Sequence, residues 1–82
     1  MTTKGATIDL TQIVARNVKL ARTRLGLTQA ELARKLGLPD GMAVSRWETA
    51  RHRPNAANLA ALADLTGEDF AWFFTDHDRA AA

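Results

Sequence analysis

The sequence predicts an all-α domain of five helices, on three observations. Apolar residues recur at helical spacing, glycines and polar capping residues separate the helical segments, and no segment alternates as a strand does. The chain has 82 residues and no cysteine, so one small core has to hold it without disulfide bonds or zinc–thiolate sites. We expect residues 11–75 to form the domain, with a flexible arm at residues 1–10 and a flexible tail at residues 76–82.

The first two helices are marked by their ends. An apolar stripe with helical spacing predicts the first helix over residues 11–25, and Gly26 ends it in the usual C-terminal manner. Thr28 begins the second helix, because Thr28 and Glu31 have the spacing of a capping box. Gly37 ends this second helix.

A turn over residues 38–41 leads into a third helix, with Asp40 as the expected N-cap and an end near Thr49. Val44 and Trp47 are its inward residues. Two short helices joined by a glycine-containing turn have the layout of a helix-turn-helix, in which the N-terminal half of the second helix of the pair enters the major groove of DNA. The expected outward set is Gly41, Met42, Ala43, Ser45 and Arg46.

The last two helices are predicted over residues 55–65 and 68–74, separated by a break at Thr66 and Gly67. The final segment carries more aromatic residues than one helix face can bury, so some have to pack on the core and others can form an exposed patch. We interpret this patch as a surface for self-association, and the alternative is that all of them fold under the body. The aromatic residues are Phe70, Trp72, Phe73 and Phe74.

Charge is divided unevenly along the chain. Residues 1–54 hold ten Lys and Arg against four Asp and Glu, whereas residues 55–82 hold one Arg against five Asp and Glu. A basic first part and an acidic last part suit one surface that meets a polyanion and another that avoids it. Chance asymmetry between two solvated faces is the alternative.

Three strings of the sequence, RTRLGLTQAELARKLG, VSRWETARHRP and LADLTGEDFAWFF, resemble the lambda-repressor/Cro-type helix-turn-helix (XRE) family over about residues 14–74. The resemblance implies a compact lambda-repressor-like DNA-binding domain whose final helix, around Trp72, serves dimerisation. It also implies that Gln29 contacts a DNA phosphate and that Arg22 and Glu48 form a partly buried ion pair between the first and third helices. The residues that it places at base edges are Met42 and Arg46.

The chemistry of the side chains suits these roles, and each has an alternative. The planar fork of Arg46 can bond the O6 and N7 atoms of guanine, although a phosphate contact or a plain surface charge also fits. Met42 can touch a thymine methyl group or pack half-buried. Gln29 is otherwise an exposed glutamine, and Arg51 and Arg53 are either phosphate contacts or part of a solvated linker.

Two departures from the family pattern affect these expectations. The turn before Ser45 is one residue longer, which can shift the side chains that lead into the groove and puts Gly41 and Met42 in question as base readers. Ala50 stands where the family has glycine after the third helix. We expect the helix to run slightly further there, since a left-handed alanine would cost about 1 kcal/mol relative to glycine.

These observations predict a sequence-specific regulator of transcription, a repressor, that binds a palindromic operator in double-stranded DNA as a homodimer. An antitoxin or a restriction–modification controller of the same fold, or a protein-interaction module without a DNA role, are the alternatives. We expect no enzyme, cofactor, metal, small-molecule ligand or membrane contact, and a cytoplasmic location at the nucleoid. The cluster Asp76-His77-Asp78 is expected to be a solvated tail, because no second cluster completes a metal or catalytic site.

Overall fold

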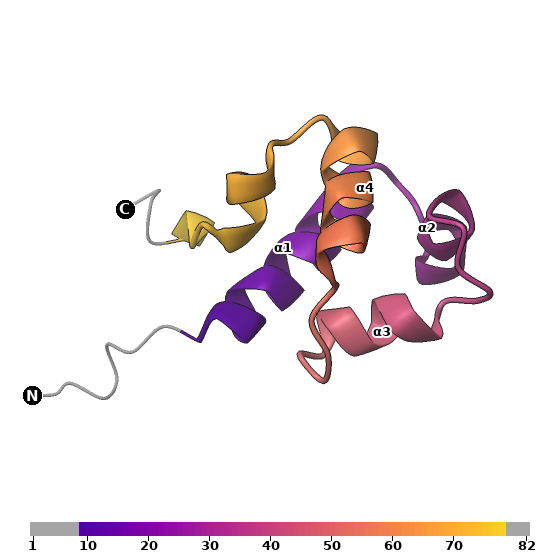
Figure 1. Cartoon of the computed structure of the whole chain (residues 1–82), viewed down its shortest axis with the longest axis horizontal. Helices are drawn as coiled ribbons and strands as arrows, with labels where there is room; N and C mark the ends of the chain where they lie inside the picture. The colour runs from indigo at the N-terminus through magenta and orange to yellow at the C-terminus, as the bar shows by residue number, and fades with distance from the viewer. Residues whose placement is uncertain (1–8, 79–82) are drawn as a thin grey trace, which may run out of the picture.

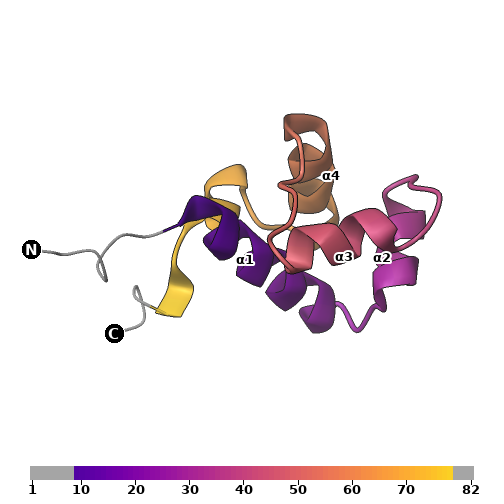
Figure 2. The same cartoon turned by 90° about the horizontal axis from the view of Figure 1, so that it is seen from below.

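The structure is a computed structural model that describes residues 9–78, and the regular structure in this part of the chain is helical throughout. Helix α1 packs against α3 and η2, α2 packs against α3, and α4 packs against η2 (Figure 1, Figure 2). No helix among these residues is long and apolar enough to cross a membrane. The elements are α1 (Leu10–Arg24), α2 (Gln29–Lys35), α3 (Met42–Glu48), α4 (Ala56–Thr66) and the 3₁₀ helix η2 (Phe70–Phe74).

All five elements contribute to a single apolar core. Most of the stripe predicted on the first helix is inward, with Val14 and Val18 completely buried, but Leu25 at its end is 41% exposed. The predicted anchors Val44 and Trp47 of α3 are also buried. Removing these side chains from water is the main favourable term that fixes α3 against the rest of the domain. The largest completely buried side chains are Phe73, Leu32, Leu62, Val14, Val18 and Val44.

The predicted capping box of α2 is confirmed. Glu31 N–H donates to Thr28 Oγ1 at 3.1 Å, and Thr28 N–H donates to Glu31 Oε1 at 2.8 Å. This second bond, to a backbone N–H, is the main reason why the pKa of Glu31 lies below its ordinary value. A side-chain oxygen of Asp9 accepts from the N–H of Thr11 and caps α1, and one of Asn55 accepts from the N–H of Asn58 and caps α4. Local polar residues therefore fix where these three helices begin.

The prediction of five helices is not confirmed, because the fifth element, η2, is a single short 3₁₀ helix after four α-helices in the described residues. Asn17 of α1 explains where η2 ends. Its side-chain amide donates to the carbonyls of Phe73 and Thr75 at 2.9 Å each and to that of Trp72 at 3.2 Å. Because the side chain of Asn17 supplies hydrogen bonds to these carbonyl oxygens, the segment can end here without the backbone N–H groups of a further helical turn.

The expectation at Ala50 is wrong. Helix α3 ends at Glu48, and Ala50 has φ +61°, in the left-handed region. The N–H of Arg51 bonds the carbonyl of Arg46 at 2.9 Å, and the N–H of Ala50 bonds that of Trp47 at 3.2 Å, which together form a Schellman motif. In the corresponding position after α1 the residue is Gly26. Alanine is therefore strained where the motif favours glycine.

Replacing Ala50 with glycine is expected to raise the free energy of unfolding by about 1 kcal/mol, because glycine adopts the left-handed conformation without a steric cost. Thermal unfolding followed by circular dichroism should show a higher melting temperature. The matched control is Ala60→Gly, an exposed position within α4, where the same change is expected to cost about 0.5–1 kcal/mol. Equal losses at both positions would contradict the strain at Ala50.

The first residues of the predicted flexible tail are instead held on the domain. Arg16 Nη1 lies 3.2 Å from Asp78 Oδ2 and 3.6 Å from Asp76 Oδ1, and His77 Nε2 lies 3.0 Å from the carbonyl oxygen of Trp72. Leu10, expected in the N-terminal arm, is the first residue of α1. Asp9, also expected in the arm, is the N-cap of α1. The remainder of the predicted arm and tail, residues 1–8 and 79–82, lies outside the described residues.

Candidate nucleic-acid interface

Helices α2 and α3 form the pair expected from the sequence, with residues 36–41 between them. The start of α3 differs by one residue from the prediction, because Gly41 and not Asp40 is the N-cap. Asp40 still binds the first turn, since its Oδ1 accepts from Met42 N–H at 2.9 Å. After this longer turn, Met42 is the first residue of α3.

The outward set predicted on α3 is smaller in the structure. Met42 is 54% exposed and Arg46 is exposed, whereas Ser45 is half-buried. Ala43 is half-buried and packs against the core, so it is not outward. Gly41 is not outward either, because a Cβ atom there would lie 3.1 Å from the backbone nitrogen of Ala30 in α2. The accessible residues of α3 that can meet a ligand are therefore Met42 and Arg46, with Ser45 between them.

An ion pair joins α1 to α3, the helix that carries this surface. Arg22 Nε lies 2.6 Å from Glu48 Oε2, and Arg22 Nη2 donates to Glu48 Oε1 at 3.0 Å. The side chains are 13% and 4% exposed, and the hydrogen bond to Glu48 raises the pKa of Arg22 above its ordinary value. The remaining Nη1 of Arg22 donates to the carbonyl of Leu27 at 2.8 Å. The pair thus locks α1 to the end of α3 and to the loop before α2.

Gln29 is the first residue of α2, and its side chain takes part in the same network. Its Nε2 donates to Glu48 Oε1 at 3.0 Å. The residue is half-buried, so part of the side chain reaches the surface. This bond could not be predicted from the sequence, because residues 29 and 48 lie on separate helices and only the fold brings them together. The phosphate contact expected for Gln29 stays a prediction.

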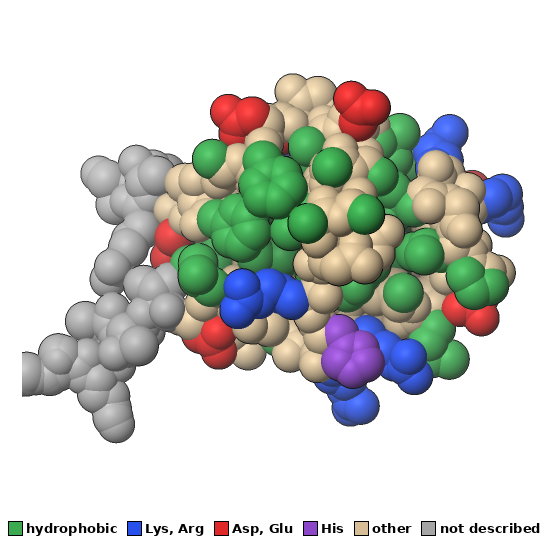
Figure 3. All heavy atoms as spheres, viewed as in Figure 1, with side chains coloured by type: hydrophobic (Ala, Val, Ile, Leu, Met, Phe, Trp, Pro, Cys, Tyr) green, Lys and Arg blue, Asp and Glu red, His purple; other side chains and the backbone are tan. Residues whose placement is uncertain are grey.

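The loop after α3 exposes the side chains of Arg51, His52 and Arg53, whereas Pro54 is buried and fixes the path of the loop into α4. Lys and Arg side chains gather beside a histidine along the lower edge of the molecule, under α3 and this loop (Figure 3). Asp and Glu side chains stand at the opposite, upper edge, above α4 and the segment that follows it (Figure 3). On the face shown, these basic and acidic groups therefore lie at opposite edges, while other charged side chains lie elsewhere on it (Figure 3).

The aromatic segment η2 divides its side chains between the core and the surface. Phe73 was expected at a dimer contact, and this is wrong for the described fold, because Phe73 is completely buried. Trp72 is half-buried and lies between His77, at 4.4 Å between ring centroids, and the guanidinium of Arg24, at 5.8 Å. Phe70 is 45% exposed, and its ring lies 5.7 Å from that of the half-buried Phe74.

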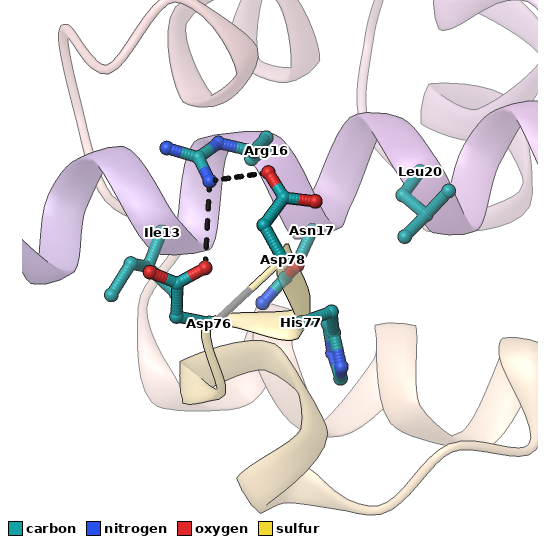
Figure 4. A pocket seen from close by; sticks show the side chains of 7 residues that line it. All are labelled: Ile13, Arg16, Asn17, Leu20, Asp76, His77 and Asp78. Atoms are coloured by element: carbon teal, nitrogen blue, oxygen red, sulfur yellow. Dashed lines mark hydrogen bonds and ion pairs between the residues drawn. The ribbon is translucent and has the colours of Figure 1, made fainter. Parts of the chain in front are cut away.

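A pocket between α1 and the segment Asp76–Asp78 holds the remaining candidate for chemistry (Figure 4). Arg16 points to both carboxylates, whereas the ring of His77 points away from them, toward the backbone of Trp72 (Figure 4). No nucleophile, base and orienting group meet there. Among residues 9–78 no group of three or more His, Asp or Glu side chains is placed to hold a metal ion.

Known proteins share both the sequence pattern and the fold. The family described as helix-turn-helix matches residues 18–73. A hypothetical transcription factor, NHTF, from Neisseria superposes with a TM-score of 0.77 and 31% identity over 89% of this chain and 84% of that one. The P22 c2 repressor, in complex with a synthetic operator, has a TM-score of 0.71 and 26% identity over 79% of this chain and 97% of that one. No curated protein matches the sequence.

Proposed function

Because the chain belongs to the XRE-type helix-turn-helix family, we propose that it represses transcription by binding a palindromic operator in double-stranded DNA as a homodimer. The chain is a DNA-binding transcriptional regulator and not an enzyme. Its proposed place of action is the nucleoid in the cytoplasm, where the operator would be. The P22 c2 repressor, which shares the fold, was crystallised with a synthetic operator.

One observation carries the proposal: α3 is anchored on one side and open on the other. Val44 is completely buried and Trp47 is 4% exposed, whereas Met42 and Arg46 lie open to solvent. The major groove admits an α-helix, and its base edges offer partners for an arginine fork and for apolar side chains. The exposed loop that carries Arg51 and Arg53 follows directly, where it can meet the phosphates beside the groove.

Homodimerisation is supported by the apolar side of η2. The ring of Phe70 is exposed next to that of Phe74, and Figure 3 shows apolar side chains gathered over η2 and the neighbouring part of α4. A two-fold axis through such a surface would pair identical patches and set two copies of α3 about one DNA turn, roughly 34 Å, apart. The operator would then be an inverted repeat.

The salt dependence of duplex binding tests the proposal. Arg51→Ala and Arg53→Ala are each expected to reduce the slope of the logarithm of affinity against the logarithm of salt concentration by about 0.9, because each arginine that neutralises a phosphate releases counterions. Fluorescence anisotropy with a labelled duplex at several KCl concentrations measures the slope.

The matched control for these two variants is Arg16→Ala, which removes an arginine that already faces Asp76 and Asp78 and should leave the slope unchanged. A wild-type slope near zero, or the same change in all three variants, would contradict a phosphate-binding loop. A slope near zero would favour a protein-interaction module instead.

Replacing Phe70 with serine is expected to shift the protein from dimer to monomer without unfolding it, because the ring is 45% exposed and contributes mainly to the proposed contact. Sedimentation equilibrium reports the mass, and circular dichroism reports the fold. Leu25→Ser is the matched control, because Leu25 is 41% exposed at the end of α1. If both variants keep the wild-type mass, the dimer does not form through η2.

A further inference from the structure

The Glu48 carboxylate makes one hydrogen bond that the ion pair with Arg22 does not require. Its Oε1 accepts from Gln29 Nε2 at 3.0 Å in addition to the bond from Arg22 Nη2. The Glu48 side chain is 4% exposed, so the bond from Gln29 is largely shielded from water. In a shielded site a hydrogen bond to a charged group is strengthened. The first residue of α2 is thereby tied to the last residue of α3.

This bond determines which way the Gln29 amide faces. A carboxylate is an acceptor only, so the NH2 end of the amide, and not its carbonyl, has to point toward Glu48. One N–H of Gln29 is then used inside the domain. The other N–H remains for a partner outside, and because phosphate oxygens accept hydrogen bonds, this N–H is the group of the Gln29 side chain that can bind a phosphate.

We propose that Glu48 is a positioning residue for DNA binding, which holds the Gln29 amide in the orientation that presents its second N–H to a phosphate. This inference rests on the proposed function. Glutamine has a flexible side chain whose rotamer freedom is lost when it is fixed, and a side chain fixed before binding does not lose that freedom in the complex. Arg22 completes the arrangement, because its bonds to Glu48 and to the carbonyl of Leu27 fix the carboxylate in turn.

Nuclear magnetic resonance tests the positioning without DNA. The chain has two glutamines, and Gln12, exposed on α1, is the internal control. In the wild-type protein, 15N relaxation of the side-chain NH2 groups is expected to show Gln29 more rigid than Gln12. In Glu48→Gln the Gln29 amide is expected to become more mobile than in the wild type, because only one neutral carbonyl oxygen remains there as an acceptor for both Arg22 and Gln29. Unchanged relaxation of Gln29 in a folded Glu48→Gln variant would overturn the proposal.

A double-mutant cycle tests the consequence for DNA, with affinities for one duplex measured for the wild type, Gln29→Ala, Glu48→Gln and the double variant. Gln29→Ala is expected to weaken binding roughly tenfold in the wild-type background, as for loss of a hydrogen bond to a charged group. In the Glu48→Gln background, the same change is expected to weaken binding less than about threefold. A purely structural role of Glu48 would instead leave the effect of Gln29→Ala equal in both backgrounds.

Circular dichroism has to confirm that each variant is folded, because Glu48→Gln leaves Arg22 without a counter-charge. If Glu48→Gln does not fold, the double replacement Arg22→Met with Glu48→Met takes its place, since it removes both charges and the acceptor for Gln29 together. Equal losses in both backgrounds overturn the role of Glu48 and leave the DNA-binding function intact. A folded wild-type protein that binds no duplex overturns both.

Discussion

Replacing Glu48 with alanine is expected to lower the free energy of unfolding by about 3–5 kcal/mol, because it leaves a buried charge without a partner. Arg22 is 13% exposed and loses both bonds to the carboxylate, while the Gln29 amide loses its acceptor. A domain of this size has only about 5–15 kcal/mol of stability, so the variant should lose a large fraction of it. Urea denaturation followed by circular dichroism measures the difference.

The control for this prediction removes both charges. Arg22→Met combined with Glu48→Met is expected to be about as stable as the wild type or more so, because apolar side chains that replace a buried ion pair carry no desolvation cost. A loss of less than about 1 kcal/mol in Glu48→Ala would show that water screens the pair. An equal loss in the double variant would show that packing, and not the unpaired charge, causes the effect.

Replacing Arg46 with alanine is expected to weaken operator binding by about 1–3 kcal/mol and to relax the preference at one base position. The side chain is exposed on α3, one turn after Met42 and on the side away from the buried Val44 and Trp47. A guanidinium fork there can bond two acceptor atoms of one guanine. Affinities for a set of operators that differ at single positions give both the overall loss and the position affected.

Arg46→Lys is the matched control, because lysine keeps the charge and lacks the planar fork. It is expected to retain part of the affinity and to lose the base preference. Because Arg46 is exposed, neither substitution should change the melting temperature appreciably. If Arg46→Ala weakens all operators alike, the residue contacts a phosphate.

Much of the fold could be predicted because its signals are local. The capping pair Thr28 and Glu31 and the terminating Gly26 act over a few residues, so the boundaries of α1 and α2 follow from the sequence to within a residue. The buried positions Val44 and Trp47 follow from helical periodicity in the same way. Signals of this kind do not depend on how distant parts of the chain meet.

The features that could not be predicted depend on contacts between distant segments. Asn17 ends η2 through carbonyls far along the chain, and Gly41 packs on the backbone of α2 although it was expected in the outward set of the third helix. Phe73 is buried in a 3₁₀ helix, whose side chains repeat every three residues, so counting an α-helical face does not identify the buried ring. Ala50 carries no local signal for a left-handed backbone, which the Schellman hydrogen bonds impose.

The residues of α3 proposed to contact bases illustrate both what the sequence predicts and what it does not. Met42 and Arg46 are accessible as the family resemblance implies, and the longer turn has not removed them from the surface. Gly41 and Ala43 belonged to the same outward set, yet one packs on α2 and the other on the core. The sequence identifies which helix faces outward, but which side of its first turn is covered depends on how α2 and α3 meet.

Selection of bound duplexes from a random pool tests most directly whether α3 reads base pairs. The account predicts an enriched motif of two inverted half-sites, with centres about 10 base pairs apart, and loss of one conserved position per half-site when Arg46→Ala is selected in parallel. A pool that stays random, or an enriched motif that is identical for the wild type and Arg46→Ala, would contradict it.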